Sequence, residues 1–166
     1  MRETVSTSPI RHSPKGGAGR GLTLNNPLNI RRVRGQQWRG EETLSNSSLK
    51  GENSALPQRE SGEETFCRFA SLEWGIRAAF RILRTYAVVH GAVCIRDIIR
   101  RWAPPTENNT DRYIRNVCQW TGLSPTQPLS ESDWPVLVRA MARQECGMLL
   151  SEESVNKAFE LYKNSL

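Results

Sequence analysis

A glutamate near the carboxyl end of the chain has the sequence context of an acid catalyst. Glu145 continues an apolar stripe at helical spacing and precedes Gly147, a residue type that commonly ends helices. Burial and the negative end of the helix dipole both disfavour the ionised carboxylate, so we expect a raised pKa for Glu145. A carboxyl group that keeps its proton near neutral pH can protonate a leaving oxygen. The alternative interpretation is a surface glutamate at a frayed helix end.

Amide and aromatic side chains near two turns are candidates for ligand binding. Residues 25–31 (NNPLNIR) form a carboxamide-rich bend, and amides suit a partner rich in hydroxyl and N-acetyl groups, although an Asx-turn leading into a strand is the alternative. Residues 101–113 form a stiff Pro-Pro connector whose aromatic residues either stack on a sugar or belong to the core, and core is favoured for Trp102. Glu107 is a weaker acid candidate. The predicted binding residues are Asn25, Asn26, Asn29, Trp38, Asn108 and Tyr113.

Helical periodicity begins at Ser71 and continues to the end of the chain. Ser71 is predicted to cap a helix with an apolar stripe over residues 72–86 and with Arg77, Arg81 and Arg84 on the other side. A second helix covers residues 95–102 and ends before Pro104 and Pro105. Three further helices are predicted: one from a Thr110 cap to Gly122, one from between Ser130 and Asp133 to Gly147, and one after Ser151.

The amino-terminal part of the chain is less regular. Residues 1–20 have few large apolar side chains and are predicted to be a flexible arm, followed by one domain over residues 21–166. Residues 45–62 read as a long surface loop. Val33–Gly40 and Thr65–Phe69 are short enough to be the two strands of a small hairpin. The expected fold is therefore mainly α-helical with a small β-hairpin.

Composition and missing motifs exclude several classes of function. The formal charge of +6 favours a polyanionic environment such as nucleic acid, phospholipid or bacterial wall polymer. No run approaches the roughly 20 apolar residues of a membrane span, and no secretory signal opens the chain. The four cysteines form no C-x-x-C pair and only two histidines are present, so a zinc site is not expected. No cofactor is expected either. No phosphate loop, serine elbow or zinc-protease motif is present, and the arginines are too dispersed to favour nucleic acid as the partner.

Several segments together resemble a family of small phage and prophage proteins, often labelled virion structural proteins and common in intestinal Bacteroidales. These are NNPLNIR, the W-x-G of residues 38–40, FCRFASLEWGIRAAFRILRTY, IIRRWAPPTENNTDRYI and a late ECG. The resemblance runs from about Gly21 to Tyr162. It implies synthesis in a bacterial cytoplasm, followed by association with the virion or release to the cell wall, and other virion proteins as candidate partners.

A more distant similarity is to wall-cleaving glucosaminidases of the lysozyme-like superfamily. Their Asn-Asn turn, hairpin and Phe-x-x-Tyr/Phe-x-Ser helix start occur here in the same order, as Asn25-Asn26 and FCRFAS, but the glutamate helix that precedes them in that superfamily is missing. AMARQECG near the carboxyl end would supply Glu145 in a permuted order if the termini lie close together. The resemblance implies a lysozyme-like domain that binds bacterial peptidoglycan and cleaves it as a glycoside hydrolase or lytic transglycosylase.

Two points stay open at the level of sequence. The second carboxylate of such a site could be Glu41, Glu42, Glu63 or Glu64, which flank the expected hairpin. The rival function is a non-catalytic virion or assembly component, in which the helices bury an interface and the arginines contact nucleic acid or acidic proteins. The position of Glu145 relative to the Asn25-Asn26 turn separates the two interpretations.

Overall fold

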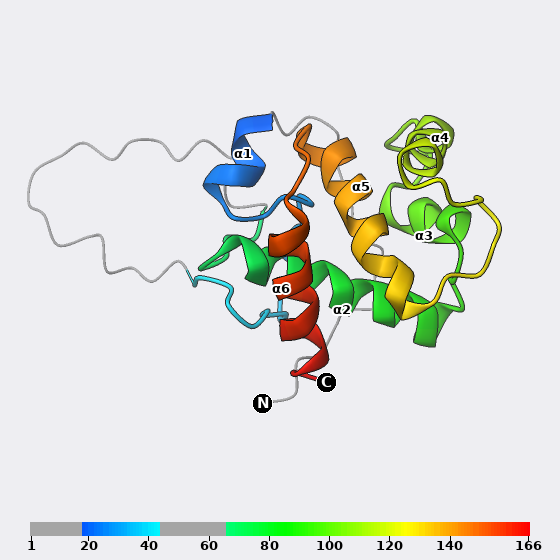
Figure 1. Cartoon of the computed structure of the whole chain (residues 1–166). Helices are drawn as coiled ribbons and strands as arrows, with labels where there is room; N and C mark the ends of the chain where they lie inside the picture. Colours follow the sequence, from blue (N-terminus) through cyan, green and yellow to red (C-terminus); the bar gives the residue numbers. More distant parts are fainter. Residues whose placement is uncertain (1–17, 44–65) are drawn as a thin grey trace, which may run out of the picture.

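The computed structural model describes residues 18–43 and 66–166 of the chain (Figure 1). Most of the expected arm and all of the expected loop 45–62 therefore lie outside the described residues. Within the described ranges the fold is mainly α-helical, with six α-helices, a short 3-10 helix and no strand. The elements are α1 (Ala18–Thr23), α2 (Leu72–His90), α3 (Ile95–Trp102), α4 (Thr110–Thr121), η3 (Glu131–Asp133), α5 (Trp134–Cys146) and α6 (Glu152–Lys163).

Helix α5 lies at the centre of the fold, between α1 on one side and α4 on the other (Figure 1). It contacts α1, α2, α4 and α6, while α2 packs along α6 and α3 packs on α4 (Figure 1). The core lies where these helices meet, and its largest fully buried side chains include Trp102, Phe80 and Tyr162. Gly21 of α1 approaches α5 closely, because a Cβ added there would lie 3.2 Å from the Cβ of Cys146. The amino-terminal bend is thereby held beside the end of α5.

The predicted helices from Ser71 onward are confirmed, with two local corrections. Asn109, and not Thr110, caps α4, because its side chain accepts the Arg112 amide at 3.1 Å while the Thr110 hydroxyl donates to the Ala103 carbonyl. Arg77 was placed on the outer side of its helix, but it is 0% exposed. Its Nε donates to Ser165 Oγ at 3.0 Å, since α6 and the residues after it cover that side of α2.

The predicted hairpin of Val33–Gly40 and Thr65–Phe69 is wrong. Among the residues that the structure describes, which leave out Thr65, only two isolated antiparallel bridges occur, Arg31 with Phe66 and Glu41 with Phe69. The chain turns at Gly35 and Gly40, with φ of 83° and 74°, conformations that suit glycine and interrupt an extended strand. Residues 66–70 instead pair their backbone with three separate segments, at Leu24, Ile30 and residues 40–42.

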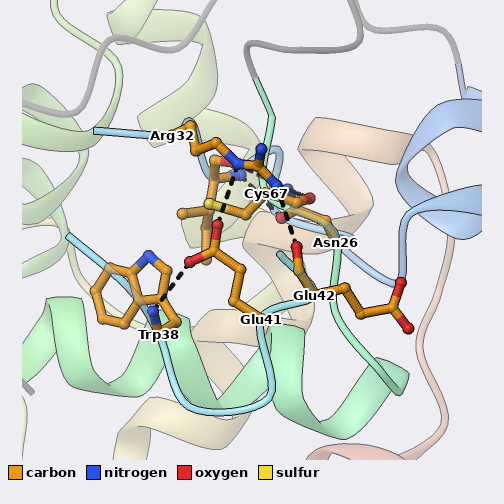
Figure 2. A network of polar contacts seen from close by, with 7 residues as sticks. Asn26, Arg32, Trp38, Glu41, Glu42 and Cys67 are labelled. Carbon is orange, nitrogen blue, oxygen red and sulfur yellow. Dashed lines mark hydrogen bonds and ion pairs between the residues drawn. The ribbon is translucent and has the colours of Figure 1, made fainter. Parts of the chain in front are cut away.

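A buried carboxylate holds this irregular segment together (Figure 2). Glu41, with a side chain 5% exposed, forms an ion pair with Arg32 at 3.2 Å and accepts the backbone amide of Trp38 at 3.0 Å. Arg32 also donates to the Glu42 carbonyl at 3.2 Å. Burial and the charge of Glu41 raise the pKa of the neighbouring Cys67 thiol. Side-chain contacts therefore fix the loop together with the few backbone hydrogen bonds that residues 40–42 form with residues 68–70.

No single helix in the described ranges is long and apolar enough to cross a bilayer. Helices α2 and α3 pass that test only as a pair, and they bend by 110° at the break between them.

Candidate active site

The Glu145 carboxylate lies where three separate elements meet. Its Oε1 accepts hydrogen bonds from Trp102 Nε1 and from the Tyr113 hydroxyl, each at 3.0 Å. Its Oε2 accepts from Asn29 Nδ2 at 3.3 Å, and the same nitrogen lies 3.2 Å from the Glu145 carbonyl oxygen. The structure therefore brings together Glu145, Asn29 and Tyr113 from the set of candidate residues.

The two carboxylate oxygens of Glu145 have different surroundings. A carboxylate has about four acceptor positions, two on each oxygen. Within residues 18–43 and 66–166, Oε1 accepts from two donors, whereas Oε2 accepts one longer hydrogen bond, from Asn29, and keeps one acceptor position unused. Glu145 as a whole is partly exposed, and Oε2 is the oxygen with room for a further hydrogen bond.

Electrostatics favour the protonated form of Glu145. Burial raises the pKa of this carboxyl, while the hydrogen bonds from Tyr113, Trp102 and Asn29 act in the opposite direction and are outweighed. Burial and the charge of Glu145 also raise the pKa of Tyr113, so its hydroxyl stays protonated and remains a donor. The site thus combines a carboxyl of raised pKa with fixed donors that orient it.

A rigid bend positions Asn29. The buried side chain of Asn26 donates to the carbonyls of Ile30 and Cys67 at 2.9 Å and accepts the Ile30 amide at 2.9 Å. Asn25 donates to the Phe69 carbonyl at 2.9 Å. Asn25 and Asn29 both have positive φ, 52° and 51°, which asparagine tolerates better than most residues. Asn25 and Asn26 therefore shape the bend, and Asn29 is the member that reaches Glu145.

The connector between α3 and α4 positions the two aromatic donors. Trp102 is fully buried, as favoured from the sequence, and its indole N–H is still directed at Glu145. The amides of Glu107 and Asn108 both donate to the Pro104 carbonyl at 3.1 Å, and Asn108 Nδ2 reaches the same oxygen at 3.3 Å. Asn108 therefore closes the connector turn, and the turn fixes where α4 presents Tyr113.

The remaining candidates lie in other surroundings. Trp38 is 4% exposed and belongs to the core, so its ring is covered by protein. Glu41 is engaged by Arg32 and by the Trp38 amide, and Glu42 and Glu107 are exposed. Glu63 and Glu64 lie outside the described residues. Among the residues that the structure describes, no group of three His, Cys, Asp or Glu side chains is arranged to hold a metal ion.

Trp102 was favoured as a core residue from the sequence, with stacking on a sugar as the alternative, and its hydrogen bond to Glu145 was not predicted. Its ring does fill the core, but an indole also carries a donor that normally finds a partner when buried. A carboxylate expected to be buried needs such donors, so the combination of Glu145 with an adjacent aromatic connector was the available signal.

Comparison with known proteins places the chain in a phage family. No family model matches the sequence. The chain is similar to Protein P5 of Pseudoalteromonas phage PM2, with 39% identity over 146 residues that cover 86% of this chain and 81% of P5. The resemblance to phage proteins is thereby confirmed. The chain belongs to the family of PM2 Protein P5.

Proposed function

We propose that the chain binds bacterial peptidoglycan and cleaves its glycan strands, with Glu145 as the general acid. The observation that carries this proposal is a partly exposed carboxyl of raised pKa, fixed by Trp102, Tyr113 and Asn29. An acid of this kind matches the requirement for protonating a glycosidic oxygen. Metal-independent cleavage of such a bond needs the proton to arrive as the carbon–oxygen bond breaks.

The arrangement of elements also supports a lysozyme-like domain. The glutamate helix α5 contacts α1, the helix that immediately precedes the Asn25-Asn26 bend. In the superfamily that the sequence resembles, a glutamate helix precedes that bend in the chain. Because α5 contacts α1, Glu145 lies beside the bend in space. Along the chain, Glu145 and Asn29 are 116 positions apart. This arrangement fits a permuted order of the same parts.

In the proposed step, the proton on Glu145 Oε2 moves to the bridging oxygen as the glycosidic bond breaks. The leaving sugar departs as an alcohol, and the anomeric carbon is left with positive charge. Either water or a hydroxyl of the same sugar then attacks that carbon and returns a proton to the carboxylate. Mass spectrometry of the fragments distinguishes these routes, because hydrolysis adds one water to the products and transglycosylation does not.

Zymography on purified peptidoglycan tests the proposal. Glu145→Gln keeps the shape of the side chain and an acceptor for Trp102 and Tyr113, but it has no proton of suitable acidity. We expect clearing by the wild type and a loss of about 100-fold or more in the variant. Glu160→Gln is a matched control, because Glu160 is exposed on α6 and forms a local ion pair with Lys163 at 2.6 Å. Equal clearing by wild type and Glu145→Gln would remove Glu145 as the acid.

The second candidate is a non-catalytic virion or assembly protein, and one observation favours it. The Glu145 carboxylate joins α5 to α3, α4 and the Asn29 bend, and a residue with a purely structural role would form the same contacts. In that case wild type and Glu145→Gln both leave peptidoglycan intact, and the variant differs only in stability.

A further inference from the structure

Helix α4 carries a row of polar and aromatic side chains that continues from the Glu145 site. Tyr113, Asn116 and Trp120 recur at the spacing that places residues on one face of a helix. Each contacts a successive residue at the end of α5. Tyr113 binds Glu145 at 3.0 Å, Asn116 Nδ2 donates to Gln144 Oε1 at 2.9 Å, and Arg143 lies over Trp120.

Arg143 is held in a fixed position at the far end of this row. Its guanidinium carbon lies 4.2 Å from the centroid of the Trp120 ring, a cation–π distance. The ring itself packs against the hydrophobic core, so the guanidinium forms the outer layer of the stack. Arg143 is exposed, and within the described ranges of the chain no carboxylate forms an ion pair with it. The planar guanidinium of Arg143 therefore faces solvent, and its side chain loses little conformational entropy when a ligand binds.

The distance along α4 matches a ligand larger than the sugar at the acid. Tyr113 and Trp120 are two helical turns apart, about 10 Å at 1.5 Å per residue. A ligand with its reacting bond at Glu145 would therefore meet the Asn116–Gln144 amide pair next and Arg143 last. Amides recognise N-acetyl and peptide groups, and an arginine fork recognises carboxylates in a two-pronged geometry.

From this arrangement we infer that Arg143, stacked on Trp120, is a specificity residue that binds a carboxylate of the peptide stem attached to the glycan. The inference rests on the proposed function and adds the substrate class to it: glycans that carry acidic peptides are preferred over neutral glycans. The hydrogen-bonded side chains of Asn116 and Gln144 lie between the acid and the arginine in this row.

Binding assays on the full-length chain test this inference. The Glu145→Gln variant is used so that the ligand is not cleaved during the measurement. Calorimetry then compares the affinity for a disaccharide that carries its peptide stem with the affinity for a neutral oligomer of N-acetylglucosamine. Adding Arg143→Gln should weaken binding of the peptide-bearing ligand about tenfold, the equivalent of one charge-assisted hydrogen bond, and change binding of the neutral oligomer by less than about twofold. Arg143→Lys keeps the charge but not the fork, so it should restore only part of the loss.

Arg115→Gln is the charge-matched control, because Arg115 is also exposed on α4 but does not belong to the row. Equal weakening by Arg115→Gln and Arg143→Gln would reduce the effect to general charge attraction and overturn the inference. Unchanged binding of the peptide-bearing ligand by Arg143→Gln would also overturn the inference. The same holds if Arg143→Gln weakens binding only to duplex DNA, tested in parallel. If the Glu145→Gln parent binds neither glycan ligand, both the proposed function and the role of Arg143 are overturned. Binding that depends on Arg143 in a protein that clears no peptidoglycan leaves the inference intact and refutes the catalytic role.

Discussion

At the scale of single residues, the protonation of Glu145 links the proposed activity to stability. The folded-state pKa of this carboxyl is raised above its ordinary value of 4.5, chiefly by burial. The native state therefore binds more protons than the unfolded state in the pH range just above 4.5. The stability from this residue is fully present below that pH and is lost as pH rises through the folded-state pKa.

Thermal unfolding across pH measures this linkage. We expect the wild type to lose stability relative to Glu145→Gln as pH rises from 4.5, because the amide does not titrate. Clearing activity should fall over the same window, since the acid then loses its proton. Parallel stability curves for the two proteins would contradict a raised pKa.

Tyr86 offers a second test at this scale. Its side chain is 4% exposed, and its hydroxyl has no hydrogen-bond partner among the described residues. A buried polar group without a partner costs about 1–3 kcal/mol. Tyr86→Phe should therefore leave the free energy of unfolding unchanged or raise it by about 1 kcal/mol in a denaturant titration. A clear loss of stability would show that the hydroxyl is satisfied in solution.

At the scale of elements, the approach of α2 to the amide-rich bend determines where Asn29 lies. Gly75 of α2 is in contact with the bend, and a Cβ added there would overlap the Asn25 carbonyl oxygen. Gly75→Ala should therefore destabilise the fold by about 1–3 kcal/mol and lower clearing, because the bend that carries Asn29 must move.

Gly35→Ala separates this effect from ordinary backbone strain. Gly35 has a φ of 83° and open space around it, so alanine there costs about 1 kcal/mol without moving the bend. Equal effects of Gly75→Ala and Gly35→Ala on clearing would contradict the role given to the close approach.

The helices from Ser71 onward were predictable because their apolar spacing and end signals agree. Ser151, Gly122 and Gly147 mark boundaries at the residues where the structure places them. Helix α1 was missed, because AGRGLT has no apolar periodicity and is stabilised by contact with α5. The hairpin failed for a related reason: ion pairing by the buried Glu41 fixes its loop, and alternation along the chain does not encode that contact.

The candidate site could be predicted only in part. A raised pKa for Glu145 follows from local pattern, and so does an amide-rich turn near Asn29. Their contact joins residues 116 positions apart and depends on α1 packing against α5, which no local signal specifies. The role of Arg77 was misjudged because an arginine on a helix usually faces solvent, and only the packing of α6 shows that it is buried.

At the scale of the whole molecule, the proposed function predicts that the net positive charge speeds the encounter with an anionic wall. The chain carries a formal charge of +6, and attraction between exposed charges is screened over about 8 Å at physiological ionic strength. The initial rate of clearing should therefore fall several-fold between low salt and about 0.5 M salt while the protein stays folded by circular dichroism. A rate independent of salt would show that charge does not guide binding.

The most direct test of the account measures soluble glycan fragments released from purified peptidoglycan by equal amounts of folded wild type and Glu145→Gln. We expect the wild type to release fragments that increase with time, and the variant to release almost none. Fragments released equally by both proteins, or by neither, would contradict the assignment of Glu145 as the acid that cleaves the glycan.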